Sequence, residues 1–197
     1  MFKQDQKTIE LLCRSYPIVT MWTMIFVLVT IRTPFFLILK NMSEVRKRGV
    51  KAKCLQSKHK NAGYKYIRKH YKRLHKAIFS ETMTDAEKMV TLFAIPNIGP
   101  RKAGFILQLC LGEVGCIDCH NSAKYDINLE NFKLHNVKKL ATKIKKAQDY
   151  ITACEQVGGS RKLWNEWCKT IAQKYPTRFA TASDVSRVHA DVIVSVV

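Results

Sequence analysis

Apolar residues recur three and four positions apart along most of the chain, a spacing typical of helices with one buried face. The pattern predicts helices over residues 65–78, 84–93, 100–111, 137–154 and 160–171, the last of them capped by Ser160, and a final helix that begins at Ser183 or Asp184. Residues 125–135 carry no regular pattern. No stretch alternates apolar and polar residues as a half-buried strand would. The sequence therefore predicts an all-α protein.

Helix boundaries are most sharply defined between residues 84 and 112. Thr84 and Glu87 have the spacing of a capping box, in which the hydroxyl and the carboxylate each satisfy a free backbone amide. Pro96 disfavours the helical conformation for the residue before it, so the first helix ends there. Pro100 suits the first position of a second helix, and Gly112 suits the end of that helix. Two short helices joined by a tight turn follow from these signals.

The longest apolar run, residues 17–39, is interrupted by Arg32 and Pro34. Its uncharged part, residues 17–31, is shorter than the roughly 20 residues that span a bilayer. Three interpretations stay open: a membrane helix, a buried N-terminal helix, or an extension that precedes an internal start at Met42. If the run spans a membrane, the basic residues after it favour a cytoplasmic C-terminal side. We divide the chain provisionally into an apolar segment, 1–41, and a basic helical domain, 42–197.

The charge is strongly unbalanced, with 34 Lys and Arg against 15 Asp and Glu, a net charge of +19 and a pI near 9.8. Such a balance favours a polyanionic partner, either nucleic acid or an anionic membrane surface. Residues 46–76 contain 13 Lys and Arg and no acid, interleaved with tyrosine and histidine. Lys69 and Arg73 lie on one face of the predicted helix 65–78, together with Tyr66 and Lys76. We expect this face to contact phosphates, with the tyrosines available for stacking.

The seven cysteines are an odd number in a chain that does not need a disulfide framework, which favours a reducing compartment. We therefore expect the cytoplasm or the nucleoid, or a membrane-anchored form if residues 17–39 span. Cys116 and Cys119 form a CxxC pair with Cys110 just before them, a spacing that occurs in zinc and iron–sulfur sites. No second CxxC follows. Buried, inert thiols are the expectation, and no metal or other cofactor is predicted.

The turn between the two short helices has the features of an anion site. The first amides of a helix have no intrahelical acceptor, and the helix dipole favours negative charge there. A DNA phosphate is the ligand that we expect, with basic side chains reinforcing the field. The DNA-binding candidates in and after this turn are Pro96, Asn97, Ile98, Gly99, Arg101 and Lys102. RNA remains open on charge alone, although the turn favours duplex DNA.

Two motifs lie at a fixed separation in this part of the chain. The first is Ile95-Pro96-Asn97-Ile98-Gly99-Pro100-Arg101-Lys102-Ala103, and the second is Ile117-Asp118-Cys119-His120. Asp118 follows Gly99 by 19 residues (118 minus 99). Together they resemble the core of the helix-hairpin-helix DNA glycosylase superfamily, the group of endonuclease III, the adenine glycosylase and the oxoguanine glycosylase. In that family the hairpin is Leu-Pro-Gly-Val-Gly, followed by a catalytic aspartate in an Asp-x-His setting. The resemblance covers residues 84–127.

The resemblance implies an all-helical fold, a hairpin that grips DNA, a flipped base in a cleft and an aspartate that stabilises the sugar cation. Carried over, Asp118 is the catalytic candidate, a role that suits a carboxylate physically. An N-cap role for Asp118 at the helix from residue 119 onward is an equal alternative. Lyase members place a nucleophilic lysine two residues after the hairpin glycine, where this chain has Arg101. Arginine stays protonated and forms no Schiff base, so lyase chemistry is not expected unless a shift of one residue presents Lys102.

Two other departures qualify the likeness. Asn97 replaces the first hairpin glycine, and asparagine tolerates the left-handed conformation better than most residues. The C-terminal four-cysteine cluster of the endonuclease III branch is absent. A further likeness, over residues 112–121 and 163–168, is to small phage-encoded proteins of the superfamily. Two functions stay open: a monofunctional DNA glycosylase without lyase activity, and a non-catalytic module for double-stranded DNA, membrane-tethered through residues 17–39 or virion-associated.

Overall fold

The computed structural model describes residues 3–194, which form α-helices and 3-10 helices and no strand. The all-α prediction is therefore confirmed for this part of the chain. The α-helices are α1 (Lys3–Ser15), α2 (Pro17–Thr30), α3 (Ile38–Arg48), α4 (Lys58–Ile78), α5 (Asp85–Leu92), α6 (Pro100–Leu111), α7 (Cys119–Lys124), α8 (Leu140–Gln156), α9 (Gly159–Lys174) and α10 (Ala182–Val194). The 3-10 helices are η1 (Phe35–Leu37), η2 (Gly49–Lys51), η3 (Lys53–Leu55) and η4 (Leu129–Phe132).

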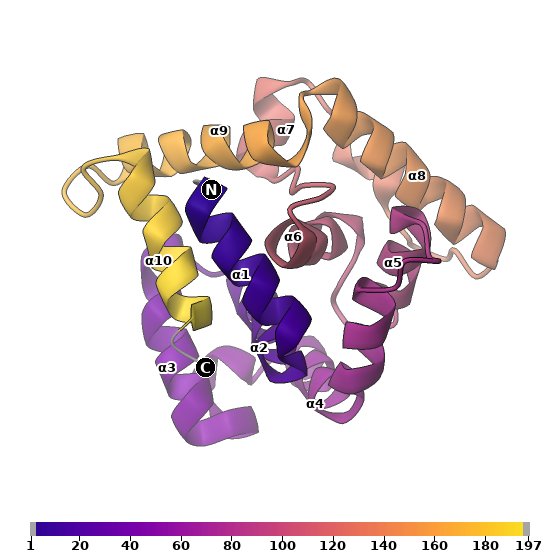
Figure 1. Cartoon of the computed structure of the whole chain (residues 1–197), viewed down its shortest axis with the longest axis horizontal. Helices are drawn as coiled ribbons and strands as arrows, with labels where there is room; N and C mark the ends of the chain where they lie inside the picture. Colours follow the sequence, from indigo (N-terminus) through magenta and orange to yellow (C-terminus); the bar gives the residue numbers. More distant parts are fainter. Residues whose placement is uncertain (1–2, 195–197) are drawn as a thin grey trace.

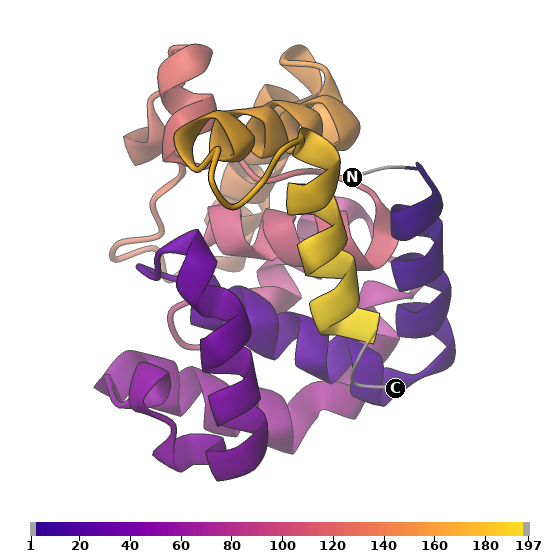
Figure 2. The same ribbon diagram turned by 90° about the vertical axis from the view of Figure 1, so that its left-hand side faces the viewer.

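Helix α6 lies at the centre of the molecule, seen end-on in Figure 1 with the other helices around it. Ten of its twelve residues are buried, from Pro100 and then continuously from Ala103 to Leu111. It packs against α1, α2, α5 and α8. Figure 2 shows α4 along one edge of the molecule and α9 along the opposite edge, with α2 and α6 between them. The elements that flank α6 are therefore held on one common support.

Helix α2 is the most apolar element, and it is buried inside the protein. Every residue from Val19 to Val29 is buried except Trp22, and α2 packs most extensively against α4. The helix ends at Thr30, and Arg32 adopts a left-handed φ of 52° before η1 and α3 begin. Residues 3–41 thus share one hydrophobic core with the rest of the described chain, across the provisional boundary after residue 41.

Helix α2 covers 14 residues of the apolar run 17–39. No helix within the described residues combines the length and the hydropathy needed to cross a bilayer.

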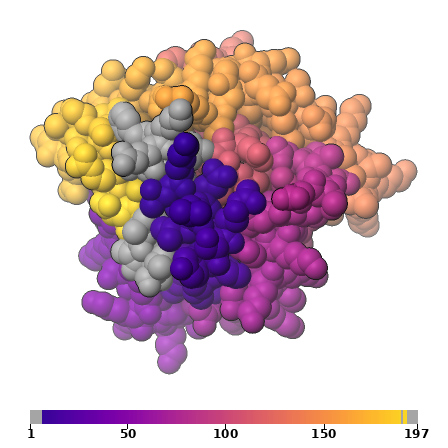
Figure 3. All heavy atoms as spheres, in the orientation of Figure 1, coloured from indigo at the N-terminus to yellow at the C-terminus, as the bar shows by residue number. Residues whose placement is uncertain are grey.

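Helix α1 lies beside α10, and Figure 3 shows it covering the face between α10 and α5.

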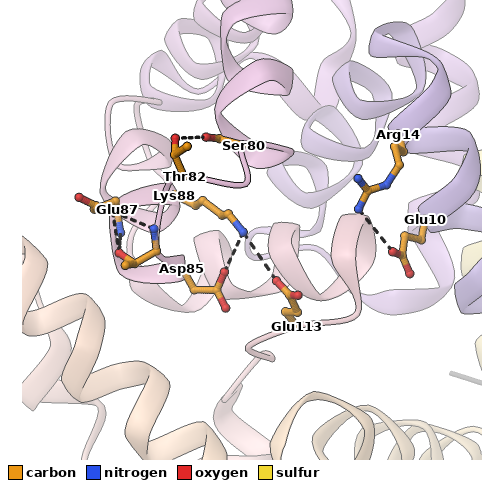
Figure 4. Close-up of polar contacts among 9 residues, drawn as sticks. Glu10, Arg14, Ser80, Thr82, Asp85, Glu87, Lys88 and Glu113 are labelled. Carbon is orange, nitrogen blue, oxygen red and sulfur yellow. Dashed lines mark hydrogen bonds and ion pairs between the residues drawn. The ribbon is translucent and has the colours of Figure 1, made fainter.

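The capping box is formed as predicted. The Glu87 carboxylate accepts from the Thr84 amide at 2.8 Å, and the Thr84 hydroxyl accepts from the Glu87 amide at 3.3 Å. The Thr84 amide and the Thr84 hydroxyl both donate to the Glu87 carboxylate at 2.8 Å, and these two hydrogen bonds lower the pKa of the Glu87 carboxyl. One turn later Lys88 lies between two acids, 3.1 Å from Asp85 and 3.9 Å from Glu113 (Figure 4). Helix α5 is therefore fixed at its first turn and tied to the end of α6.

Other boundaries differ from the prediction. Helix α4 begins at Lys58 rather than residue 65, because the Ser57 hydroxyl accepts from the Lys60 amide at 3.3 Å and caps the helix. Helix α8 begins at Leu140 rather than 137, and residues 125–135 include η4. The predicted cap at Ser160 is wrong, because α9 begins at Gly159 after a left-handed Gly158 with no side-chain cap.

Candidate nucleic-acid interface and cavity

The hairpin between α5 and α6 has the predicted turn geometry. The Ile98 amide donates to the Ile95 carbonyl at 3.0 Å, and Asn97 adopts a left-handed φ of 73°. Ile95 and Ile98 are buried, whereas Asn97 is exposed at the tip. Gly99 is the N-cap residue of α6, with Pro100 at its first position. The apolar residues thus anchor the hairpin, and its tip and the N-terminus of α6 face outward.

Helix α4 supports the hairpin through a glycine. A Cβ atom on Gly63 would lie 2.7 Å from the Pro96 carbonyl oxygen and 3.0 Å from a Leu28 methyl group. Real Cβ atoms essentially never come within 3.0 Å of such a neighbour. The backbone of the hairpin therefore rests directly on α4, at a distance that only glycine permits.

A cavity of about 830 Å³ opens beside the hairpin. Its wall combines the N-terminal half of α6 with residues 30–35, η4, the start of α7 and α9. Four aromatic rings line it in sequence, with centroid distances of 6.0 Å from Phe105 to Trp164, 5.5 Å from Trp164 to Trp167 and 5.3 Å from Trp167 to Phe35. Its volume lies in the range of small-molecule sites. It is large enough for a planar ring and has rings on its wall to stack against.

Basic side chains predominate around this cavity. The lining includes five of them, Arg32, Arg101, Lys102, Lys133 and Lys174, against the acids Asp118 and Glu130. Lys133 and Glu130 form an ion pair at 2.7 Å, which leaves four cations and one carboxylate. The field at the mouth of the cavity therefore favours an anionic ligand.

Asp118 caps α7 and also lies on the wall of the cavity. As the N-cap of α7, its Oδ1 accepts from the His120 amide at 3.0 Å and from the Asn121 amide at 2.8 Å. The half-buried side chain also lines the cavity, together with Arg101 and Lys102. The helix cap therefore holds the Asp118 carboxylate in place on the wall of the cavity.

Two buried side chains hold the backbone around Asp118. The Tyr150 hydroxyl donates to the Gly115 carbonyl at 3.1 Å and accepts from the Ile117 amide at 2.9 Å. The Asn121 amide group donates to the Cys116 and Leu163 carbonyls, both at 3.2 Å. Tyr150 is fully buried, and burial raises its pKa well above the ordinary value. Both sides of Asp118 are thus attached to the core, through α8 and α9.

Lys102 and Arg101 differ in exposure. The Lys102 ammonium donates to the Thr30 hydroxyl at 3.1 Å and lies 5.4 Å from the centroid of the Phe105 ring, whereas Arg101 is exposed. Nearby, the buried Lys60 donates to the Val29 carbonyl at 3.3 Å. Burial, and to a smaller degree the charge of Lys102, lowers the pKa of Lys60. Lys102, which lies one residue after the position of the nucleophilic lysine in lyase members, is therefore held against the cavity wall.

Helix α4 presents the basic surface predicted for it. Seven of its cations are exposed, and none of them forms an ion pair among the described residues: Lys58, Lys65, Arg68, Lys69, Lys72, Arg73 and Lys76. The helix contains no acid. Arg73 donates to the Tyr66 hydroxyl at 2.7 Å, which groups a cation with an aromatic ring on the same surface.

The cysteines differ in part from the prediction of buried thiols. Cys110 is fully buried. Cys116 is half-buried, and Cys119 is exposed. Within the described residues, one group of metal-ligand type is formed by Asp118, Cys119 and His120, whose donor atoms lie within 4.8 Å of one another.

Sequence reasoning missed most of the cavity wall. Trp164 is buried in the core, and both it and Trp167 line the cavity. Arg32, Phe35 and Lys174 were not singled out, because they lie far from the hairpin in sequence. Of these three residues only Arg32 stands out in the sequence, because it interrupts the apolar run 17–39.

Comparisons with protein-family models, with curated proteins and with solved structures find no match. Function is therefore inferred from the geometry of the hairpin, the cavity and α4.

Proposed function

We propose that this protein binds double-stranded DNA and removes a base from it by hydrolysing an N-glycosidic bond. The observation that carries the proposal is a single cavity, lined by aromatic rings, that has the Asp118 carboxylate on its wall and the hairpin beside it. A duplex must release its target base from the stack before an enzyme can reach the glycosidic bond. The cavity supplies the volume, the rings and the carboxylate that this requires.

DNA binding is the better supported half of the proposal. The hairpin tip and the N-terminus of α6 provide backbone amides for one phosphate, and Arg101 lies beside them. The exposed cations of α4 provide further phosphate contacts with no competing acid. Gly63 brings α4 into direct contact with the hairpin backbone, so the basic helix and the hairpin are neighbours.

Asp118 acts electrostatically in this mechanism. Two amides hold Oδ1, so Oδ2 is the oxygen directed toward substrate. As the bond to the base breaks, the sugar carbon gains positive charge, which a fixed carboxylate stabilises without reorganising. The same oxygen can orient the water that completes the hydrolysis.

Lys102 serves as a positive charge in the cavity rather than as a nucleophile, so no lyase activity is proposed. Its ammonium donates to Thr30 and lies near the Phe105 ring, an arrangement that suits contact with a phosphate beside the extruded nucleotide. Borohydride trapping on DNA with an abasic site tests this assignment directly. A covalent adduct with wild type that Lys102→Gln abolishes would make Lys102 the nucleophile instead.

The decisive experiment uses Asp118→Asn. Asparagine caps a helix about as well as aspartate, so this change removes the charge and keeps the cap of α7. We expect base release from a panel of damaged and mismatched duplexes to be lost while duplex affinity is retained. Asp149→Asn, an exposed change on α8, is the matched control and should retain both. Base release that survives Asp118→Asn rules out the catalytic role.

A non-catalytic DNA-binding module is the second candidate, because the two cap hydrogen bonds account for Asp118 without any chemistry. This candidate predicts no base release by wild type and identical binding by Asp118→Asn. Both candidates predict steeply salt-dependent binding, with a slope that falls by about 0.9 for each phosphate contact removed. Lys69→Gln and Arg73→Gln should each lower that slope. Lys169→Gln, which removes a cation paired with Glu166, should leave it unchanged.

A further inference from the structure

Three consecutive residues at the edge of the cavity bring together the side-chain donors of a metal site. The donor atoms of Asp118, Cys119 and His120 lie within 4.8 Å of one another, and all three residues line the cavity. In a tetrahedral zinc site the bond lengths are about 2.3 Å to sulfur and 2.0–2.2 Å to nitrogen or oxygen. Small side-chain rotations therefore suffice to bring all three donors onto one ion.

We propose that Asp118, Cys119 and His120 bind a divalent transition-metal ion of the zinc class. This inference does not rest on base excision. A bound ion would use Asp118 Oδ2, the oxygen that the excision mechanism directs toward substrate, so the ion and the substrate would compete for it. A carboxylate oxygen, a thiolate sulfur and an imidazole nitrogen together select zinc over magnesium or calcium, which prefer oxygen ligands alone. Three protein ligands leave one position open, and the cavity is the space beside it.

The donors are available for coordination. Asp118 uses Oδ1 for the cap of α7, while Oδ2 accepts no hydrogen bond from any described residue. The Cys119 thiol and the His120 ring likewise form no hydrogen bond with the side chains and backbone that the structure describes. The cap, Asn121 and Tyr150 already fix the backbone that carries the three donors. Little conformational entropy is therefore lost when an ion binds.

The surrounding positive charge does not oppose this site. A zinc ion bound by one carboxylate, one thiolate and one neutral imidazole is a complex of zero net charge. Arg101 and Lys102 therefore face no excess positive charge once the ion is bound.

Cys116 is the competing ligand, since it forms the CxxC pair with Cys119. The donor atoms that lie within 4.8 Å of one another are those of Asp118, Cys119 and His120, and the Cys116 thiol is not among them. Cys119 is exposed, whereas Cys116 is half-buried. The geometry favours the three consecutive residues, with Cys116 outside the coordination sphere.

Titration of the metal-free full chain with Co²⁺ tests the site. A bound thiolate gives a sulfur-to-cobalt charge-transfer absorption, and Zn²⁺ should displace the cobalt and remove it. We expect Cys119→Ser to abolish the absorption. His120→Gln should weaken cobalt binding by more than the roughly 10- to 100-fold that loss of an outer partner costs. Cys116→Ser and Cys54→Ser are matched controls that should retain the absorption.

The proposal is overturned if wild type gives no charge-transfer absorption, or if the absorption persists in Cys119→Ser. Loss in Cys116→Ser would equally overturn it, because the site would then be a CxxC pair. Cys119 and His120 are not core residues, so circular dichroism should show that both variants fold. No base-release assay enters this test, so its failure is distinct from failure of the proposed excision.

Discussion

The contact between α4 and the hairpin makes Gly63→Ala a sharp test of the structure. The added Cβ would lie 2.7 Å from the Pro96 carbonyl oxygen, whereas ordinary contacts begin at 3.4 Å, so the backbones must separate by about 0.7 Å (3.4 minus 2.7). Neither neighbour is the end of a long flexible side chain: one is backbone and the other is a buried leucine. The substitution must therefore move the hairpin backbone away from α4, because no flexible side chain can move aside in its place.

Two opposing effects set the size of the change. Replacing glycine by alanine inside a helix stabilises it by about 0.5–1 kcal/mol. Overpacking of a close contact costs about 1–3 kcal/mol. We therefore expect net destabilisation of about 1 kcal/mol, which lowers Tm by about 2–4 °C for a chain of this size. Thermal unfolding and duplex affinity, measured on the same samples, should both fall.

Gly99→Ala is the matched control. A Cβ there meets nothing within 4 Å, and the φ of −107° at Gly99 is accessible to alanine. Its Tm should stay within a degree or so of wild type, since surface changes are usually worth less than about 0.5 kcal/mol. If Gly63→Ala raises Tm instead, the helix preference has prevailed. The hairpin then does not rest on α4, and the reasoning is refuted.

Three further changes test other parts of the structure. Tyr150→Phe should cost about 1–3 kcal/mol in urea unfolding, because it leaves two buried backbone groups without their hydroxyl partner; Tyr16→Phe, at an exposed site, should cost nothing measurable. Brief alkylation of the native protein, followed by mass spectrometry, should label Cys119 and spare Cys154, whose burial raises its pKa; equal labelling would contradict the burial. The lowered pKa of Glu87 means that its cap stabilises the fold above the ordinary value of 4.5 and is lost as the pH falls through the lowered value. Glu87→Gln should therefore flatten the dependence of Tm on pH in that acid range, and an unchanged profile would count against the cap.

Local signals explain why the elements around the hairpin were predicted well. The capping box at Thr84, the proline at position 100 and the left-handed Gly112 all act over fewer than five residues. Ser57 was a signal of the same kind that was missed, because the residues after it are polar and hide the helical period. Gly158 supplanted Ser160 because a left-handed glycine can begin a helix without a side-chain cap.

The cavity could not be predicted in this way. Its wall draws on residues from Thr30 to Tyr175, which meet only through packing on α6. Tryptophan in an amphipathic helix reads as core in the sequence, and Trp164 is indeed buried. That its neighbours Trp167 and Phe35 continue the same wall depends on where η1 lies against α9. Lys102 lines the cavity because its side chain reaches the Thr30 hydroxyl, a contact that its position in the sequence does not reveal.

The central burial of α2 has a consequence for how the chain reaches its native state. Residues 17–30 leave the ribosome before their partners α4, α6 and α10 are made. The apolar surface of α2 therefore stays exposed until these three helices have been synthesised. Such a segment is a binding site for chaperones and a starting point for aggregation. Expression yield should accordingly depend on the rate of translation more than the stability of the finished fold would suggest.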